Sequence, residues 1–209
     1  MTLFQFSTPI RDTGTAVTVS LRDGLAVLRP IGPGEHGPLN EVFDAMSEQS
    51  RFSRYLTSLN QMPSGMRRAL TAVDGHDHVA WLASVEGRPV GIGRYIRTAP
   101  CTVEVAFEVV DAHQGRGLGT VLVDALSTVA AVSGIRRVEA TVLASNKVSL
   151  LLLRRIGLSF RATAGQLDGT GELRLLDPPR IDRPAVARLG LAANTVPHGS
   201  RSVGAAAAR

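Results

Sequence analysis

The stretch from Val103 to Leu122 constrains the fold of this chain more than any other. Its sequence is VEVAFEVVDAHQGRGLGTVL, in which an alternating apolar run is followed by Gly115, Gly117 and Gly119 and then by apolar residues at helical spacing. Alternation predicts a strand, and a repeat at i, i+3 and i+4 predicts an amphipathic helix. We therefore expect a strand, a glycine-rich turn and a helix in direct succession.

This succession suits a phosphate group. The first turn of a helix has unpaired backbone N–H groups and a partial positive charge, and glycines let a bulky anion approach the backbone. The alternative is a tight turn that binds nothing. We expect a phosphate-bearing ligand, with an arginine adding charge, and the candidate binding residues are Gln114, Gly115, Arg116, Gly117, Leu118, Gly119 and Thr120.

Two common phosphate loops do not fit the spacing. A P-loop needs a lysine between its last glycine and the following Ser or Thr, whereas Thr120 follows Gly119 directly. A dinucleotide loop needs a third glycine at position 120. Glu139 lies near the position of a ribose-binding acid, but the elements before the loop look like antiparallel hairpins rather than βαβ units. The ligand is therefore expected to be neither a P-loop nucleotide nor a dinucleotide.

The remaining elements alternate between strand and helix patterns. A hairpin is predicted around the Asp-Gly pair in residues 16–31, and another around EGRP in residues 78–98. Ser50 is a candidate cap for the second of two helices in residues 38–59. Further helices are predicted at residues 64–73, 117–134 and 144–157, and further strands at 102–110, 136–143, 158–163 and 171–176.

Composition narrows the classes of partner. A net charge of +5 favours an anionic ligand, but the arginines are scattered without interleaved aromatics, so we expect no nucleic acid. No apolar run is long enough to cross a membrane, and no signal-peptide pattern is present, so a cytoplasmic protein is expected. Cys101 is the only cysteine, and His76 and His78 lack a third ligand signal, so no metal is expected.

The glycine-rich segment resembles a family signature. Residues 114–119, QGRGLG, are similar to the Q/R-x-x-G-x-G/A motif with which GNAT acetyltransferases bind the pyrophosphate of acetyl-CoA. The order of elements resembles that family too, and Asn146, Ser149 and Gly157 match its second acyl-CoA motif. The resemblance implies an α/β fold with a mixed, mostly antiparallel central sheet flanked by helices, and acetyl-CoA as co-substrate.

The resemblance also suggests how the chain is divided. It covers residues 17–176, so these residues are expected to form one acetyltransferase domain after an N-terminal extension of residues 1–16. Residues 177–209 contain several prolines, an alanine run and many small residues. We expect them to form a flexible tail that folds back at most near residues 184–192.

A narrower likeness concerns the acceptor. Residues 47–55, SEQSRFSRY, resemble a stretch of bacterial Pat-type protein lysine acetyltransferases, and residues 90–97 and 104–107 continue that likeness. It implies direct transfer of acetyl from acetyl-CoA to the ε-amine of a lysine on a protein, in a ternary complex. Two alternatives remain open: a small-molecule amine as acceptor, and an acyl-CoA sensor that does not catalyse.

The resemblance assigns roles to single residues. Glu104, ten positions before Gln114, matches the general base, and Glu108 on the same face of the strand is expected to tune Glu104 or orient substrate. The backbone groups of Val109 and Val110 are expected to pair with pantetheine, and one N–H to polarise the thioester carbonyl. Asn146 and Ser149 join the cofactor-binding set. Leu153 stands where many relatives have a tyrosine that protonates the thiolate.

Overall fold

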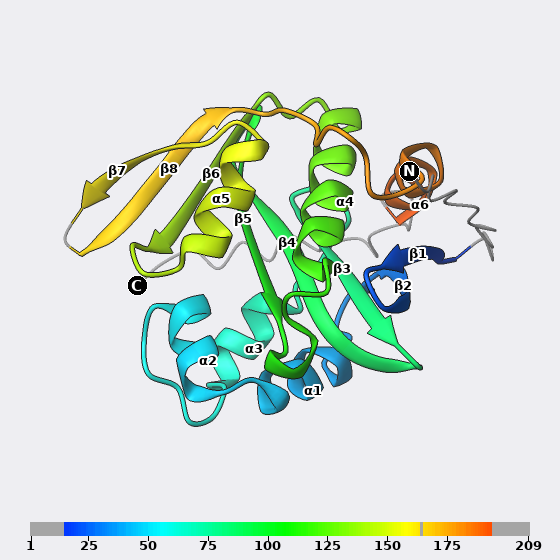
Figure 1. Cartoon of the computed structure of the whole chain (residues 1–209). Helices are drawn as coiled ribbons and strands as arrows, with labels where there is room; N and C mark the ends of the chain where they lie inside the picture. The colour runs from blue at the N-terminus through cyan, green and yellow to red at the C-terminus, as the bar shows by residue number, and fades with distance from the viewer. Residues whose placement is uncertain (1–14, 164, 194–209) are drawn as a thin grey trace, which may run out of the picture.

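An eight-stranded sheet runs through the computed structural model, which describes residues 15–163 and 165–193 (Figure 1). The strand order is β1-β2-β3-β4-β5-β6-β8-β7, and β5 pairs with β6 in parallel whereas the other neighbours pair antiparallel. This is the expected mixed sheet. The strands are β1 Val17–Leu21, β2 Gly24–Pro30, β3 His78–Val85, β4 Arg88–Ala99, β5 Thr102–Val109, β6 Arg137–Leu143, β7 Ser159–Thr163 and β8 Gln166–Glu172.

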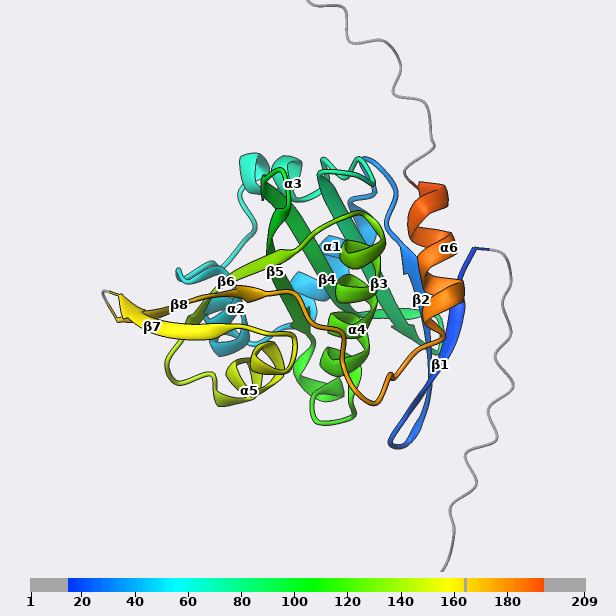
Figure 2. The same ribbon diagram turned by 90° about the horizontal axis from the view of Figure 1, so that it is seen from above.

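Helices cover both faces of the sheet. Figures 1 and 2 show α1–α3 on one face and α4–α6 on the other. The largest fully buried side chains include Trp81 on β3, Tyr95 on β4 and Leu122 on α4, so the core lies around the central strands. The helices are α1 Gly37–Ala45, α2 Glu48–Tyr55, α3 Ser64–Leu70, α4 Leu118–Val132, α5 Lys147–Arg155 and α6 Arg183–Ala193.

Two boundaries differ from the sequence-based expectation. Ser47, not Ser50, caps α2, because its Oγ accepts the backbone N–H of Ser50 at 3.2 Å. The last strand begins at Gln166 rather than at residue 171. The glycines of this strand carry no side chains that would show an alternating pattern. A side chain at Gly169 would clash with the ring of Phe160, which lies against the backbone there.

Part of the expected C-terminal tail is a docked helix. α6 packs against α4 and β2 (Figure 2). It is anchored by Asp124 on α4, whose fully buried carboxylate accepts the backbone N–H of Arg180 at 2.6 Å and pairs with the guanidinium of Arg183 at 2.8 Å. Most of the N-terminal extension, residues 1–14, and the end of the tail, residues 194–209, lie outside the described residues.

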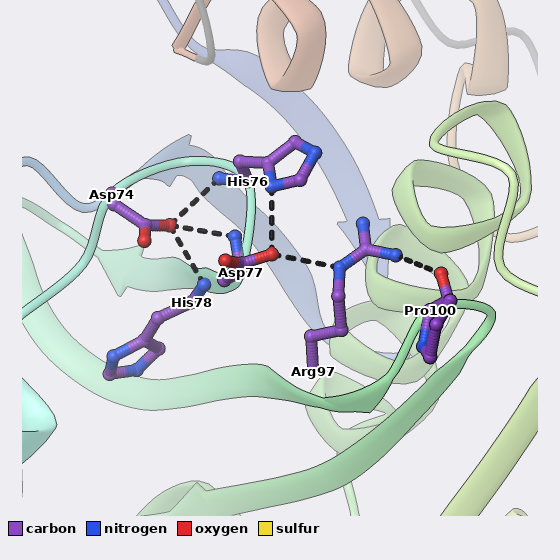
Figure 3. A network of polar contacts seen from close by, with 6 residues as sticks. All are labelled: Asp74, His76, Asp77, His78, Arg97 and Pro100. Carbon is purple, nitrogen blue, oxygen red and sulfur yellow. Dashed lines mark hydrogen bonds and ion pairs between the residues drawn. The ribbon is translucent and has the colours of Figure 1, made fainter.

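A polar network fixes the loop between α3 and β3 (Figure 3). The Asp74 carboxylate accepts the backbone N–H groups of His76, Asp77 and His78 at 2.8–2.9 Å, and Asp77 pairs with Arg97 on β4 at 2.9 Å. Partial burial opposes ionisation of Asp74, but the three donors outweigh it and hold the pKa of Asp74 below its usual value. The network therefore fixes the start of β3 against the end of β4.

Candidate active site

The site begins where two parallel strands separate. Pairing between β5 and β6 ends at Glu104 and Glu139, although β5 continues to Val109 and β6 to Leu143. A cavity of about 1030 Å³ is lined by residues of both strands, of α2 and α3 on one face of the sheet, and of α4 and α5 on the other. The cavity therefore connects the two faces of the sheet at this separation.

Backbone groups of β5 are free to face this gap. The N–H of Val110 donates to the carbonyl of Val90 on β4, and its carbonyl accepts the N–H of His113. Backbone groups alternate in direction along a strand, so those of Val109 point away from β4 and toward β6. The carbonyl of Val109 accepts the side-chain amide of Gln114 at 3.0 Å. The N–H of Val109 thus faces the gap, whereas its carbonyl and both backbone groups of Val110 are already used within the protein.

The loop after β5 lies along the same cavity. Gly117 precedes the first residue of α4 with a φ of 102°, and Gly115 has a φ of 74°, a region that side chains disfavour. The loop therefore turns sharply and presents the N-terminus of α4 to the cavity. Of the candidate binding residues in this segment, those that line the cavity are Gln114, Gly115, Gly117, Leu118, Gly119 and Thr120.

Arg116 differs from the expectation that it adds charge to the phosphate site. Its Nε donates to Asp23 in the β1–β2 turn at 2.7 Å, and its Nη1 lies 2.7 Å from Nδ1 of His113. Its carbonyl accepts the N–H of Arg22 at 3.2 Å. The guanidinium is held against the hairpin and does not line the cavity. Its side chain thus fixes the hairpin to the loop.

The start of α5 forms another part of the wall. The side-chain oxygen of Asn146 accepts the backbone N–H of Ser149 at 3.1 Å and caps the helix, and both residues line the cavity. Leu152 lies against the position of Gly119, so α5 packs beside the first turn of α4. Leu153 is buried in the cavity wall, where it presents hydrocarbon.

On the opposite face of the sheet, Glu104 is exposed in the cavity wall. Its carboxylate has no ion pair or hydrogen bond among the residues that the structure describes. The wall from α2 and α3 combines the polar Ser50, Ser53 and Arg54 with Tyr55, Leu56, Met66 and Leu70. The Tyr55 hydroxyl is buried without a partner in the described residues, and burial raises the pKa of Tyr55, so it stays neutral.

Glu108 has a different environment. Its side chain is fully buried between Arg54 on α2 and Arg94 on β4, whose Nη2 lies 3.4 Å from Oε1 of Glu108. Arg94 also donates to the carbonyl of Leu70 at the end of α3. Burial is the largest effect on both guanidinium groups, and it lowers the pKa of Arg94 despite Glu108. At Arg54 the charge and hydrogen bond of Glu108, together with the charges of Tyr55 and Glu104, outweigh burial and raise the pKa. Glu108 therefore joins α2, α3 and β4.

A second set of contacts fixes the start of α2. The Asp111 carboxylate accepts the backbone N–H of Ser47 at 2.7 Å, the Ser47 hydroxyl at 2.8 Å and the Ser50 hydroxyl at 2.7 Å. Gln114 donates to Ser50 at 3.2 Å. Partial burial opposes ionisation, but these donors hold the pKa of Asp111 below its usual value. The acid thus links the glycine-rich loop to the helix on the other face.

Comparison with known proteins identifies the family. Residues 40–158, more than half of the chain, match the model of the acetyltransferase (GNAT) family. This chain is a member of the GNAT family. It is 30% identical over 153 residues to acetyltransferase Pat of Mycolicibacterium smegmatis, an alignment that covers 68% of this chain. The chain spans only 44% of the length of that relative.

Solved structures agree with this assignment. The GNAT domain of S. lividans PAT has a TM-score of 0.70 and 28% identity, and the match covers 80% of this chain and 100% of that domain. A putative acetyltransferase from Salmonella typhimurium, solved with its cofactor acetyl-CoA, has a TM-score of 0.56 and 20% identity, over 73% of this chain and 95% of that one. The second likeness shows the GNAT fold alone.

Most residues proposed from the sequence meet in this GNAT cavity. Glu104 lines it, together with Val109, the glycine-rich loop apart from Arg116, and the start of α5. Sequence reasoning missed Arg54 and Arg94, the partners of Glu108, and Arg22 in the cavity wall. Arg54 lies in the quoted 47–55 stretch, but spacing along one sequence does not show which acid lies opposite it.

Residues 15–163 and 165–193 contain no cluster of three or more His, Cys, Asp or Glu side chains that could hold a metal ion. Within the same ranges no helix is both long and apolar enough to cross a bilayer.

Proposed function

We propose that this GNAT protein transfers acetyl from acetyl-CoA to the ε-amine of a lysine on a protein, by direct transfer in a ternary complex. One observation carries the proposal: a single cavity connects the N-terminus of α4 on one face of the sheet with the exposed carboxylate of Glu104 on the other. Two reactants that enter from opposite faces would meet at β5.

The co-substrate side fits a phosphate-bearing thioester. Unpaired N–H groups in the first turn of α4 would receive the diphosphate of CoA, which the positive end of the helix also favours. The N–H of Val109 would pair with the pantetheine arm or polarise the thioester carbonyl. Asn146 and Ser149 would border the arm from α5. The membership in the GNAT family supports this placement.

The acceptor side fits an amine that must lose a proton. A lysine has a pKa near 10.4, so making it neutral at pH 7 costs about 4.6 kcal/mol. Glu104 would take this proton directly or through water. The neutral nitrogen then forms the new C–N bond, and the C–S bond breaks to release the thiolate. The nitrogen loses its second proton as the C–N bond forms. Leu153 has no proton to give, so the thiolate takes its proton from water or from this departing lysine proton.

A protein acceptor is favoured by the surface around the cavity. Phe52 on α2, the helix on the acceptor face, is an exposed apolar side chain. Such an apolar side chain is more readily covered by a protein surface than by a small amine. The similarity to acetyltransferase Pat and to the S. lividans PAT domain supports the same choice.

Acetyl-lysine mapping tests the proposal. The protein is incubated with acetyl-CoA and a cell lysate, and acetylated peptides are identified by mass spectrometry, with Glu104→Gln as the matched control. New sites that depend on Glu104 are the expected result. Release of CoA with small amines but not with lysate protein would indicate that the acceptor is a small-molecule amine. Tight binding of acetyl-CoA, without release of CoA in the presence of any acceptor, would indicate an acyl-CoA sensor.

A further inference from the structure

We propose that Arg22, at the tip of the β1–β2 hairpin, binds a phosphate of CoA and completes the phosphate site that the loop of α4 begins. This inference rests on the proposed use of acetyl-CoA. The hairpin lies outside residues 40–158, the part that matches the family model. Arg22 is therefore a binding residue that the glycine-rich motif does not include.

The hairpin tip is fixed to the loop by two contacts, and a third holds the Arg116 side chain within the loop. The N–H of Arg22 donates to the carbonyl of Arg116, the Nε of Arg116 pairs with Asp23, and the Nη1 of Arg116 lies against His113. Figure 2 shows this tip beside the loop that begins α4. Because Arg116 is paired with the hairpin, a side-chain cation that serves the cavity at this end has to come from another residue.

Arg22 is the arginine that is placed to bind a phosphate in the cavity. Three arginines line the cavity: Arg22, Arg54 and Arg155. Arg54 is paired with Glu108 on the acceptor face, and Arg155 donates to the carbonyl of Asp177 at 3.4 Å. The Arg22 guanidinium is exposed, with no acid or carbonyl partner in the described ranges.

The chemistry of the group suits a phosphate. A guanidinium offers paired N–H donors that match two phosphate oxygens, and it is charged at every working pH. The backbone of Arg22 is held by the loop while its side chain is unpaired, so binding would break no ion pair. CoA carries a diphosphate and a 3′-phosphate, and either could be the group bound.

Binding measurements distinguish these possibilities. Acetyl-CoA and 3′-dephospho-acetyl-CoA are titrated by calorimetry into the wild-type chain, Arg22→Ala, Arg22→Lys and Arg161→Ala, an exposed arginine of β7 outside the cavity. Loss of a charge-assisted hydrogen bond predicts a Kd for acetyl-CoA that is about 10- to 100-fold higher in Arg22→Ala. Arg22→Lys should recover part of this loss, and Arg161→Ala should bind like wild type.

The two ligands identify the phosphate. If Arg22 binds the 3′-phosphate, Arg22→Ala and wild type bind the dephospho compound equally; if it binds the diphosphate, the variant binds both ligands more weakly by the same factor. A Kd of Arg22→Ala for acetyl-CoA within twofold of wild type overturns the inference, as does an equal loss of affinity in Arg161→Ala. Wild-type protein that does not bind acetyl-CoA refutes the proposed function as well. Thermal unfolding confirms that each variant is folded.

Discussion

Glu104 and Glu108 lie on the same strand and on the same face, four residues apart, yet their environments are opposite. Glu104 is exposed in the cavity with no ion pair among the described residues, whereas Glu108 is fully buried between Arg54 and Arg94. A carboxylate that must accept a proton from substrate has to be reachable, and a carboxylate that joins elements has to be enclosed. The comparison separates a candidate chemical group from a structural one.

The difference comes from α2. Arg54 on this helix covers Glu108, and the start of the helix is fixed by Asp111 through Ser47 and Ser50. The helix thus covers one end of the face of β5 and leaves Glu104 open. The buried acid holds the acceptor wall in place, and the exposed acid lies beside that wall.

The largest expected effect is on stability when Glu108 is changed. Glu108→Gln leaves Arg54 and Arg94 without their acid, and removing one partner of a buried ion pair costs about 3–5 kcal/mol of unfolding free energy. Urea unfolding followed by circular dichroism measures the loss. Glu104→Gln is the matched control and should change stability by less than about 0.5 kcal/mol. Equal losses in both variants would erase the distinction between the two acids.

The next effect is on turnover when Glu104 is changed. Glu104→Gln keeps the size of the side chain but cannot accept a proton, so we expect turnover at neutral pH to fall on the order of 10²-fold or more. The Kd for acetyl-CoA should stay within twofold, because the carboxylate lies on the acceptor face. A thiol-trapping assay for released CoA gives the rate. An unchanged rate would remove Glu104 from its proposed role.

Lowering the pH should reduce the free energy of unfolding through His78, a buried residue whose pKa is affected by Arg94, the partner of Glu108. Burial, and then the charge of Arg94, lower the pKa of His78 to about 4, compared with about 6.5 in the unfolded chain. His78 is neutral in both states above about pH 6.5, and below it the unfolded chain gains the proton first. The contribution of His78 to the free energy of unfolding is therefore fully present at neutral pH. Between about pH 6.5 and 4 this contribution falls by about 1–3 kcal/mol.

Substitution isolates this contribution. Unfolding free energies of wild type and His78→Gln are measured from pH 7 to pH 4.5, and the variant should lose less stability across that range. Parallel curves would show that His78 does not titrate as proposed. Glu104→Gln serves as a further comparison, since Glu104 forms no hydrogen bond or ion pair with Arg54, Arg94 or His78 in the described residues, although its charge reaches Arg54.

The smallest effect concerns the contact that fixes α2. Ser47→Ala removes the helix cap and one bond to Asp111, which should cost about 1 kcal/mol. Thermal unfolding measures the change, and Ser53→Ala, a serine within the same helix, is the control. If α2 shifts as a result, the KM for the acceptor should rise while the Kd for acetyl-CoA is retained. A rise in both the KM for the acceptor and the Kd for acetyl-CoA would indicate that the glycine-rich loop is displaced instead.

The local pattern of this protein was accessible from its sequence. Alternation predicted β5, helical spacing predicted α4, and the glycines placed a sharp turn between them, because these features depend on neighbouring residues. The motif QGRGLG and the order of elements pointed to the GNAT fold. The β8 strand was misplaced because glycines at 169 and 171 carry no side chain to mark the alternation.

Tertiary structure alone decided which charged side chains form ion pairs and which do not. Arg54 meets Glu108 across 54 positions, and Arg116 meets Asp23 across 93 positions, so no local pattern could pair them. The same holds for Asp124, which anchors the segment before α6. Spacing gives the direction of a side chain on its own strand or helix, but the partner that buries or neutralises its charge comes from another element, and folding alone brings the two together.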